Sequence, residues 1–332
     1  MAVTIKDIAK MAGVSITTVS RILNNKEGFI SEATREKVLR IVKEQGYTPN
    51  SFARSLVTNQ SRMLGLILPD IVNPYFPELY RACDDQAQEK GYTLLLCNSD
   101  DESEKVKGYM EFLARRGVDG ILLASSGVSP ELEQIDRLGI PIVTIDQYLE
   151  ECSWHVGDIG NDNTYGVYLA VSHLIGRGHE KIGFLCGKEG TFTSKRRYQG
   201  YQQALREHGL TVQPELVCFG EYQHRFGYQK TRELVRQGQP FTALCCMSDT
   251  VALGAMAALR EEGIRVPKDC AVMGYDNTYI SDLIEKPLST INRFTTDMAK
   301  LGVQVLVDYI EGKNKEYVEK ILKPTLVVRK TT

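Results

Sequence analysis

The stretch Thr4–Asn24 constrains the fold of this chain most, because it places two short amphipathic helices around one tight turn. Thr4 can cap a helix, and Asp7 follows at the reciprocal position of a capping box. Gly13 can end this helix, and Ser15 can cap a second helix that runs to about Leu23. This arrangement is typical of a helix-turn-helix, whose second helix fits the major groove of DNA. The pattern alone fits an ordinary helical hairpin equally well.

Apolar residues at helical spacing define which face of each helix points inward. The inward set comprises Ile5, Ile8, Ala9 and Ala12 in the first helix, Val14 at the corner, and Val19, Ile22 and Leu23 in the second. A third helix follows, with Ser31 as its cap, Val38, Ile41 and Val42 on its inner face, and Gly46 at its end. Residues 1–48 are therefore expected to form a three-helix module.

The charge is distributed unevenly along the chain. The first 60 residues contain nine Lys/Arg and five Asp/Glu, whereas the remaining residues contain 31 and 37, so a mildly basic arm precedes an acidic body. A basic arm suits contacts with phosphates, although +4 is a weak signal by itself. No apolar run is long enough to span a bilayer, and no apolar segment of a signal peptide precedes the first helix. We therefore expect a cytoplasmic protein without a membrane partner.

From residue 62 onward, apolar strand-like runs alternate with amphipathic helical segments. The strand-like runs are 62–70, 92–100, 117–125, 140–146, 181–187, 216–219, 242–248 and 270–276, and helical segments separate most of them. This alternation predicts an α/β fold with parallel, doubly wound sheets. The first and second series look like copies of one plan, and two such lobes would hold a small ligand between the carboxyl ends of their strands.

Several motifs in order carry a family resemblance. They are TIKDIAKMAGVSITTVSRILN, TREKV, GYTPN, ARSL, GVDGIL, HLIGRGHEKIGF, RYQGY, SDTVALGAM, MGYDN and PLSTI. Together they resemble the lactose/galactose-repressor family of bacterial regulators, and the resemblance covers essentially the whole chain.

The resemblance implies a domain plan. It consists of a helix-turn-helix domain (1–48), a hinge helix or linker (49–60), and two lobes of the periplasmic-binding-protein type. The first lobe would comprise 61–160 and 292–320, and the second 161–291 and 321–332, so that the chain crosses between the lobes three times.

Candidate DNA contacts lie on the second helix and in the hinge. Ile16, Thr17, Ser20 and Arg21 face outward, and the resemblance implies that Ile16, Thr17 and Arg21 read the operator bases. Ser15, Thr18 and Asn24 suit phosphate contacts, which position the protein on the duplex. The resemblance further implies that Ala53 and Leu56 enter the minor groove, where Leu56 would wedge between base steps. Otherwise Leu56 would only pack the linker onto the body.

Partners follow from the same features. Two copies would read a palindromic operator, because such modules bind as two-fold symmetric pairs. No leucine-heptad extension follows the last strand, so a homodimer is expected rather than a tetramer built on a coiled coil.

Polar and aromatic side chains directly after strands form the candidate effector site. The positions that match the family's effector contacts are Asn73, Tyr75, Phe76, Ser125, Asp146, Thr193, Arg197, Tyr222, Ser248, Asp276 and Arg293. Asp276 and Arg197 are the firmest candidates, because a carboxylate and a guanidinium can grip adjacent hydroxyl groups. Asp249 is instead expected to cap the helix that follows it.

Arg293 departs from the family pattern, because most sugar-binding relatives have a neutral glutamine there. A second arginine in the cleft suggests an anionic effector such as a sugar acid or sugar phosphate. Alternatively, Arg293 pairs with Asp146 or Asp276 and the effector is a neutral sugar. The two alternatives have similar weight.

Rival functions lack their motifs. The chain contains no GxGxxG that opens a helix, no P-loop, no HExxH and no GxSxG, so we expect neither an enzyme nor a cofactor. Its eight cysteines are scattered without zinc-ligand spacing, so no metal is expected. A solute-binding protein would share the cleft, but this chain has a DNA arm where a signal peptide should be.

The sequence therefore predicts a transcriptional regulator, most simply a repressor of carbohydrate-utilisation genes released from its operator by a sugar or a sugar derivative. A corepressor-dependent regulator, of catabolite-control or purine type, is the alternative.

Overall fold

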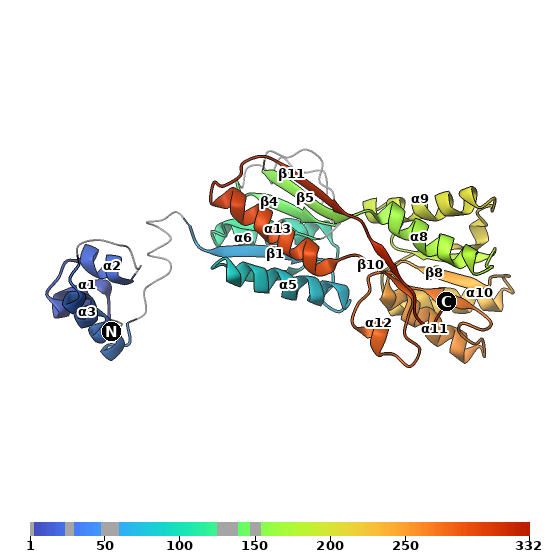
Figure 1. Cartoon of the computed structure of the whole chain (residues 1–332), viewed down its shortest axis with the longest axis horizontal. Coiled ribbons are helices and arrows are strands. Elements are labelled where there is room, and N and C mark those ends of the chain that lie inside the picture. The colour runs from blue at the N-terminus through green and yellow to red at the C-terminus, as the bar shows by residue number, and fades with distance from the viewer. Residues whose placement is uncertain (1–2, 24–29, 48–59, 125–138, 147–153) are drawn as a thin grey trace. The chain divides into compact units, whose positions relative to one another are not determined.

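The computed structural model describes residues 3–23, 30–47, 60–124, 139–146 and 154–332. Contacts divide the chain into two compact units, Met1–Ser61 and Arg62–Thr332, and each is considered by itself (Figure 1). Residues 49–59 of the predicted hinge segment lie outside the described residues. The sequence pattern also predicts a helix at 132–139, of which only Gly139 is described.

The described residues of the first unit form three helices, α1 (Ile5–Ala12), α2 (Ile16–Leu23) and α3 (Glu32–Glu44). The capping box is present, because the Asp7 carboxylate accepts the Thr4 N–H at 2.9 Å and the Thr4 hydroxyl accepts the Asp7 N–H at 3.4 Å. Gly13 ends α1 with a φ of 69°, a left-handed conformation that glycine adopts without steric cost. The predicted start and end of the first helix are confirmed.

The core of this unit is small and is built from all three helices. Its buried members are Ile8, Ala9, Ala12, Val19, Ile22 and Val38, and Ile5, Val14, Leu23, Ile41 and Val42 are packed around them. These are the side chains that helical spacing predicts to point inward. The Ser31 hydroxyl accepts the Thr34 N–H and caps α3 as predicted.

The second unit contains two parallel sheets. The larger sheet has the strand order β11-β5-β4-β3-β1-β2. Its strands are β1 (Met63–Leu68), β2 (Thr93–Asn98), β3 (Gly120–Leu123), β4 (Ile142–Ile145), β5 (His155–Asn161) and β11 (Val318–Leu322). The smaller sheet has the order β7-β6-β8-β9, with β6 (Ile182–Cys186), β7 (Val217–Phe219), β8 (Ala243–Cys246) and β9 (Ala271–Met273). The predicted doubly wound α/β architecture is confirmed.

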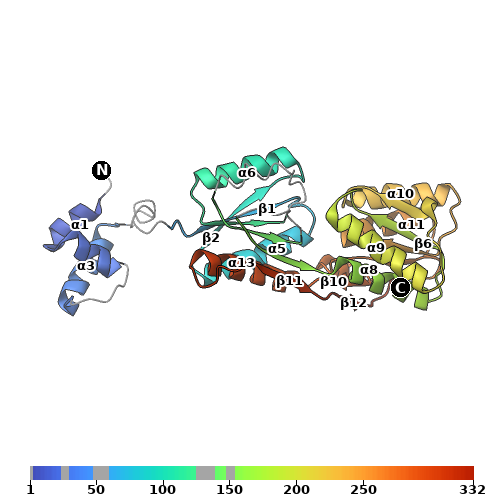
Figure 2. The same ribbon diagram turned by 90° about the horizontal axis from the view of Figure 1, so that it is seen from above.

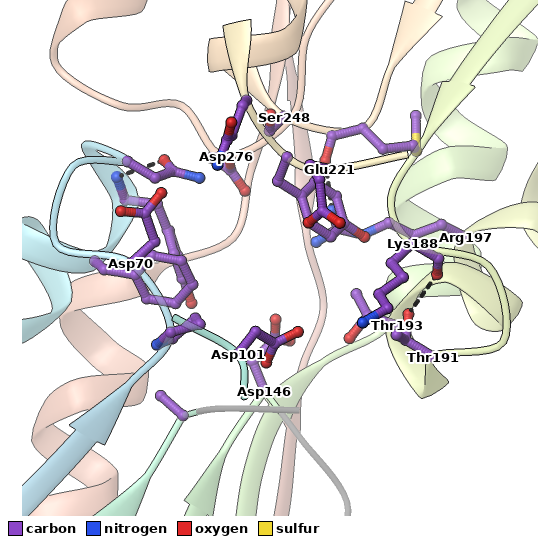
Figure 3. Close-up of a pocket in the computed structure, with 18 of the residues that line it drawn as sticks. Asp70, Asp101, Asp146, Lys188, Thr191, Thr193, Arg197, Glu221, Ser248 and Asp276 are labelled. Atoms are coloured by element: carbon purple, nitrogen blue, oxygen red, sulfur yellow. Dashed lines mark hydrogen bonds between the residues drawn. The ribbon is translucent and has the colours of Figure 1, made fainter. Parts of the chain in front are cut away.

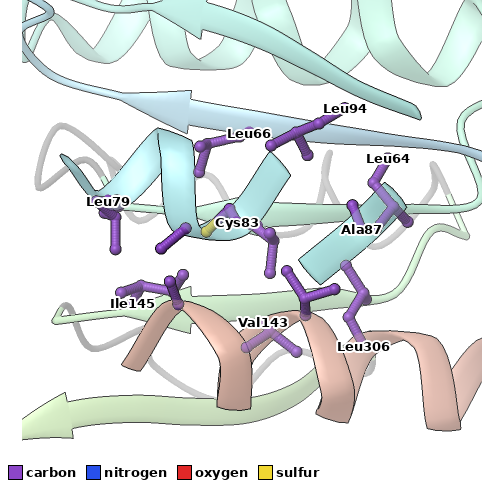
Figure 4. Close-up of a cluster of buried hydrophobic side chains, with 14 of the residues drawn as sticks. Leu64, Leu66, Leu79, Cys83, Ala87, Leu94, Val143, Ile145 and Leu306 are labelled. Carbon is purple, nitrogen blue, oxygen red and sulfur yellow. The ribbon is translucent and has the colours of Figure 1, made fainter. Parts of the chain in front are cut away.

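Helices cover both faces of the larger sheet. They are α5 (Tyr75–Glu89), α6 (Ser103–Arg115) and α13 (Thr295–Ile310). Figure 2 shows α6 on one face and α5 with α13 on the other. Leu64, Leu66 and Leu68 pack towards α5 and α13, and Figure 4 shows Leu64 and Leu66 in this cluster. Ile67 packs on the opposite face, towards α6. Burial on both faces explains why these strands read as continuous apolar runs.

The smaller sheet is covered in the same way. Helices α8 (Asn163–Gly176) and α9 (Phe192–Glu207) share one core with Phe184 and Cys245. Helices α10 (His224–Arg236) and α11 (Asp249–Glu261) form the other core with Leu185 and Leu244. A short 3₁₀ helix, Pro214–Leu216, leads into β7.

Three crossings of the chain join the two lobes. The chain leaves β5 for α8, returns from β10 (Thr290–Asn292) to α13, and leaves β11 for β12 (Thr325–Val327). Strand β12 pairs antiparallel with β10, and the short helix α12 (Ile280–Leu283) precedes β10. The expected final strand is therefore two strands, of which the first lies in the larger sheet.

Arg62 fixes the start of the second unit. Its φ is 59°, its N–H donates to the Asp119 carboxylate at 2.8 Å, and its guanidinium donates to Glu311 at 2.7 Å. The guanidinium also lies 4.8 Å from the centre of the Tyr92 ring. Bonds to three separate elements hold this residue in its unusual backbone conformation.

Two elements differ from the sequence prediction. Strand β5 was not expected, because HVGDIGN contains no apolar run. Its Asp158 is 4% exposed, and it accepts hydrogen bonds from the hydroxyls of Thr144 and Tyr317 and lies 2.8 Å from Nε2 of His155. The sequence pattern predicts a helix from Tyr198, but helix α9 begins six residues earlier, at Phe192, because the Thr191 hydroxyl caps it.

Helices α10 and α11 approach each other through two glycines. A Cβ on Gly254 would lie 1.9 Å from the carbonyl oxygen of His224, and a Cβ on Gly227 would lie 2.0 Å from that of Val251. Because the obstacles are backbone atoms, a side chain at either glycine would push the helices apart.

We predict that Gly254→Ala destabilises the protein by about 1–3 kcal/mol, the usual cost of overpacking. Gly108→Ala is the matched control, because Gly108 is an exposed residue inside α6 and a Cβ added to it would meet nothing within 4 Å. Alanine should stabilise that helix by up to about 1 kcal/mol. Urea unfolding followed by circular dichroism gives both values. Equal midpoints for the two variants would contradict this account of the α10–α11 contact.

Candidate functional site

A cavity of about 190 Å³ lies where strands of both sheets end. Its walls come from the segments after β1, β2, β3 and β4 of the larger sheet and after β6, β7, β8 and β9 of the smaller sheet. The volume exceeds the space for a single water molecule many times over, so a small organic molecule fits. Figure 3 shows Asp70, Asp101 and Asp146 facing Lys188, Arg197 and Glu221 across this space.

The structure brings the predicted effector residues together at this cavity. Those that line it are Asn73, Tyr75, Phe76, Asp146, Thr193, Arg197, Tyr222, Ser248, Asp276 and Arg293. Ser125 lies outside the described residues. Lining residues that the sequence reasoning did not select include Asp70, Asp100, Asp101, Lys188, Thr191, Glu221 and Gln223. They follow strands or begin helices too, but their sequence surroundings resemble ordinary polar loops.

Arg293 belongs to the lining of the cavity and is 3% exposed. Its guanidinium donates to Asp276 at 2.8 Å and also to Asp146, and it lies 4.1 Å from the centre of the Tyr75 ring. Asp146 follows β4 and Asp276 follows β9, so Arg293 joins the ends of both sheets. The predicted pairing of Arg293 with these carboxylates is confirmed, and the neutral effector that accompanied it stays a prediction.

Arg197 is the second buried cation of the cavity and is 2% exposed. Its Nε donates to the side-chain oxygen of Asn163 at 2.8 Å, and Nη1 donates to the carbonyl of Met247 at 2.5 Å. Its guanidinium lies 4.1 Å from the centre of the Tyr275 ring. Neutral acceptors and aromatic faces therefore surround this arginine.

Four buried polar atoms of the lining lack a hydrogen-bond partner among the described residues. They are the Tyr75 hydroxyl, Thr193 Oγ1, Arg197 Nη2 and Arg293 Nε. Leaving such groups unpaired costs about 1–3 kcal/mol each, unless a ligand or water supplies the missing partners. All four atoms can donate, so a ligand that is rich in acceptor oxygens or nitrogens would complement them.

Two arginines and two carboxylates of the lining balance each other. Arg197 and Arg293 oppose Asp146 and Asp276. Among the other lining residues, Asp70, Asp100, Asp101 and Glu221 outnumber Lys188, so the whole lining carries a formal charge of −3. Burial raises the pKa of Asp276 above its usual value, although the two arginines oppose that shift.

Asp249 does not cap α11, so that prediction was wrong. The cap is Ser248, whose hydroxyl accepts the Val251 N–H at 3.1 Å. The Asp249 carboxylate is turned inward and accepts hydrogen bonds from Thr278 and Thr290. Burial, followed by the nearby charge of Asp276, raises its pKa to about 7.

Asn161 and Asn163 are buried residues that bond to the lining of the cavity, and the sequence reasoning did not select them. Both side-chain amides donate to Asp146, at 2.7 Å and 3.3 Å, and Asn163 also accepts from Arg197. They therefore connect the acidic and basic groups of the cavity floor. No apolar run marks β5, so no signal placed these asparagines at the end of a strand.

The exposed face of α2 carries the predicted base-reading residues. Ile16, Thr17 and Arg21 are exposed, and Ser20 is half-buried. The Ser15 hydroxyl accepts the Thr18 N–H at 3.0 Å and lies 2.9 Å from Thr18 Oγ1, so both hydroxyls already stabilise the start of α2. DNA contacts by all of these residues stay predictions. Asn24, Ala53 and Leu56 lie outside the described residues.

In the described part of the chain, no group of three or more His, Cys, Asp or Glu side chains could hold a metal ion. None of the helices there is long and apolar enough to cross a membrane.

Two domain profiles match the sequence. Residues 4–50 match the profile described as bacterial regulatory proteins, lacI family, and residues 171–332 match a periplasmic binding protein-like domain. Curated relatives include the HTH-type transcriptional repressor PurR of Haemophilus influenzae strain PittEE, which is 37% identical over 99% of this chain and 98% of its own length. PurR of Pasteurella multocida is 36% identical over the same shares.

Solved structures agree in fold over all or most of the chain. The lac repressor dimer bound to operator and the anti-inducer ONPF is 28% identical, with a TM-score of 0.89 over 100% of this chain and 99% of that one. The complex of the transcriptional regulator CelR with cellobiose is 30% identical, with a TM-score of 0.76 over 99% and 100%. A lacI-family regulator from Enterococcus faecium with bound ribose is 29% identical, with a TM-score of 0.74 over 81% and 98%.

We predict that Arg293→Gln lowers the free energy of unfolding by about 3–5 kcal/mol near pH 8, because it leaves two buried carboxylates without their cation. The pKa of Asp276 should then rise further above its value in the unfolded chain. A carboxyl group whose pKa is raised on folding favours the folded state at low pH and loses that contribution as the pH rises.

Part of the lost stability should therefore return towards pH 5, which urea unfolding at both pH values measures. Arg265→Gln is the control, because Arg265 pairs with Asp269 on the surface. A loss of unfolding free energy in Arg293→Gln that is the same at both pH values would contradict the pairing of Arg293 with buried carboxylates.

Proposed function

The chain belongs to the lacI family of bacterial regulatory proteins, and from this premise we propose that a neutral, polar small molecule between its two lobes controls its binding to operator DNA. It is a DNA-binding transcriptional repressor of that family and not an enzyme. The proposal adds the class of effector and the residues that receive it. The operator would be two-fold symmetric and bound by a homodimer in the cytoplasm.

The observation that carries the proposal is the pairing of Arg293 with Asp146 and Asp276. An arginine that is already neutralised by two carboxylates offers little to an anionic effector. The net −3 charge of the lining would also repel an anion. Neutral effectors are therefore favoured over anionic ones such as sugar acids and sugar phosphates. From the sequence alone, the neutral and the anionic class had equal weight.

A neutral sugar is the first candidate. Sugars carry many hydroxyl oxygens, which would accept hydrogen bonds from Tyr75, Thr193, Arg197 and Arg293. The rings of Phe76 and Tyr222 also line the cavity and offer apolar faces. Cellobiose and ribose occupy the related proteins described above.

A purine base is the second candidate, because repressors named PurR are the curated relatives at 35–37% identity over nearly the full length. A planar, neutral heterocycle would fit the aromatic faces, and its ring nitrogens and carbonyl oxygen would accept the same four donors. In this case the protein would act as a corepressor-dependent regulator.

Occupancy would act through the angle between the lobes. The Glu78 carboxylate accepts the Tyr279 N–H at 2.8 Å, and the Thr250 hydroxyl lies 3.4 Å from Asn73 Oδ1, so contacts already cross the cleft. A ligand that favours one angle would bias the equilibrium. In our proposal, the segment 49–60 transmits the change in lobe angle to the helix-turn-helix domain. Ala53 and Leu56 would be its minor-groove contacts.

We predict that a neutral compound raises the melting temperature in a thermal-shift screen, whereas its anionic counterpart does not. The matched pairs are glucose with gluconate and ribose with ribose 5-phosphate, and hypoxanthine and guanine test the purine class. A ligand at 100 times its Kd stabilises the folded state by about 2.7 kcal/mol. Thr193→Val should reduce the shift, because it removes a free hydroxyl without changing the shape. Stabilisation by only the anionic members would contradict the proposal.

We predict that Arg21→Ala weakens binding to the cognate operator by about 1–3 kcal/mol and relaxes base preference, because arginine reads guanine with two hydrogen bonds. Arg40→Ala is the matched control, since it removes the same charge from an exposed position on α3. Fluorescence anisotropy would compare an operator selected from a two-fold symmetric library with a shuffled duplex. Equal losses on both duplexes for Arg21→Ala would exclude base reading by this residue.

A further inference from the structure

The turn Gly274–Thr278 carries Asp276 into the cavity and has an unusual backbone. It follows β9 directly, and φ is 121° at Asp276 and 57° at Asn277. Residues with a side chain rarely adopt positive φ, and each such residue costs of order 1–3 kcal/mol unless its surroundings hold it. Something outside the turn must therefore keep it in this conformation.

Asp249, the first residue of α11, forms hydrogen bonds that hold this turn. Its carboxylate accepts the Thr278 N–H at 2.8 Å and the Thr278 hydroxyl at 2.9 Å. Its own N–H donates to the carbonyl of Tyr275 at 2.7 Å. The same residue thus holds the turn on both sides of Asp276.

The other carboxylate oxygen of Asp249 reaches β10. It accepts the Thr290 hydroxyl at 2.6 Å, and Thr290 Oγ1 in turn accepts the Asn277 N–H at 3.3 Å. Strand β10 leads within one residue to Arg293, the partner of Asp276. Asp249 therefore connects the two segments that present this ion pair to the cavity.

The fit around Asp249 is close. A Cβ on Gly274 would lie 2.4 Å from its Oδ1, so the carboxylate lies directly against the backbone at the end of β9. Asp249 is 1% exposed and is absent from the cavity lining. Placing a carboxylate here is costly, since burial and the charge of Asp276 both oppose its ionisation.

We propose that Asp249 is a positioning residue, which holds the Gly274–Thr278 turn and β10 so that Asp276 and Arg293 present their charges correctly to the effector. The inference rests on the proposed function, in that the cavity is taken as the effector site. Asp249 itself contacts no ligand and acts only through the turn.

Amide hydrogen exchange of the ligand-free full chain tests this inference. In Asp249→Ala, the amides of residues 276–278 should exchange at least about tenfold faster than in the unsubstituted protein, because about 1.4 kcal/mol of lost hydrogen bonding corresponds to a factor of ten. The amides of α9, in the same lobe, should stay within about threefold.

Asp249→Asn is the conservative rescue variant. Its amide oxygen can accept from Thr278, and its NH₂ group can donate to Thr290 Oγ1, so exchange at 276–278 should return to within about threefold of normal. Thr278→Val and Thr278→Ser form an uncharged matched pair. Valine removes one hydroxyl donor to Asp249, whereas serine keeps it, so only valine should accelerate exchange at the turn.

Three results would overturn the proposal. One is unchanged exchange at 276–278 in Asp249→Ala. Another is equal acceleration throughout the lobe, which would indicate a general structural role. The third is an asparagine variant that exchanges as fast as the alanine variant. Because no effector is present in the measurement, failure of the ligand screen would leave its outcome unaffected.

Discussion

The rest of the structure depends on burying Arg293 between Asp146 and Asp276. A guanidinium that is only 3% exposed needs charged partners, because water no longer solvates it. One partner follows β4 of the larger sheet, the other follows β9 of the smaller sheet, and the arginine follows the strand that runs between the lobes. The ion triad therefore forms only when both lobes and the crossing strand are in place.

The same triad determines what the cavity can recognise. The triad carries a net charge of −1, and Asn163 links its Asp146 to Arg197, whose positive charge balances it. Together with Asn161, which also donates to Asp146, these residues form a hydrogen-bonded network without net charge. The atoms left unpaired are donors at its surface. A neutral ligand with several acceptors would complete this network and, by touching residues of both lobes, would favour one angle between them.

The sequence predicted the architecture well, because buried parallel strands read as apolar runs and the helix caps have clear signatures. Strand β5 was not predicted, because the polar residue Asp158 occupies a core position in it. Asp158 forms hydrogen bonds with Thr144, His155 and Tyr317, which come near it only in the folded chain. The polar residues that line the cavity could also be predicted, because they directly follow the apolar runs that mark the strands. Their pairing could not be decided from the sequence: the neutralisation of Arg293 was one of two open alternatives, and the inward turn of Asp249 was not predicted, since both depend on partners from distant segments.

The division of the chain at Arg62 has a consequence for how such regulators diversify. The first unit is continuous in sequence, and the residue that follows it, Arg62, is anchored entirely within the second unit by Asp119, Glu311 and Tyr92. A single recombination event ahead of Arg62 would therefore exchange the DNA arm while preserving the body. Swapping one lobe would need three simultaneous breakpoints, so chimaeras of this protein should acquire new target genes far more readily than new signals.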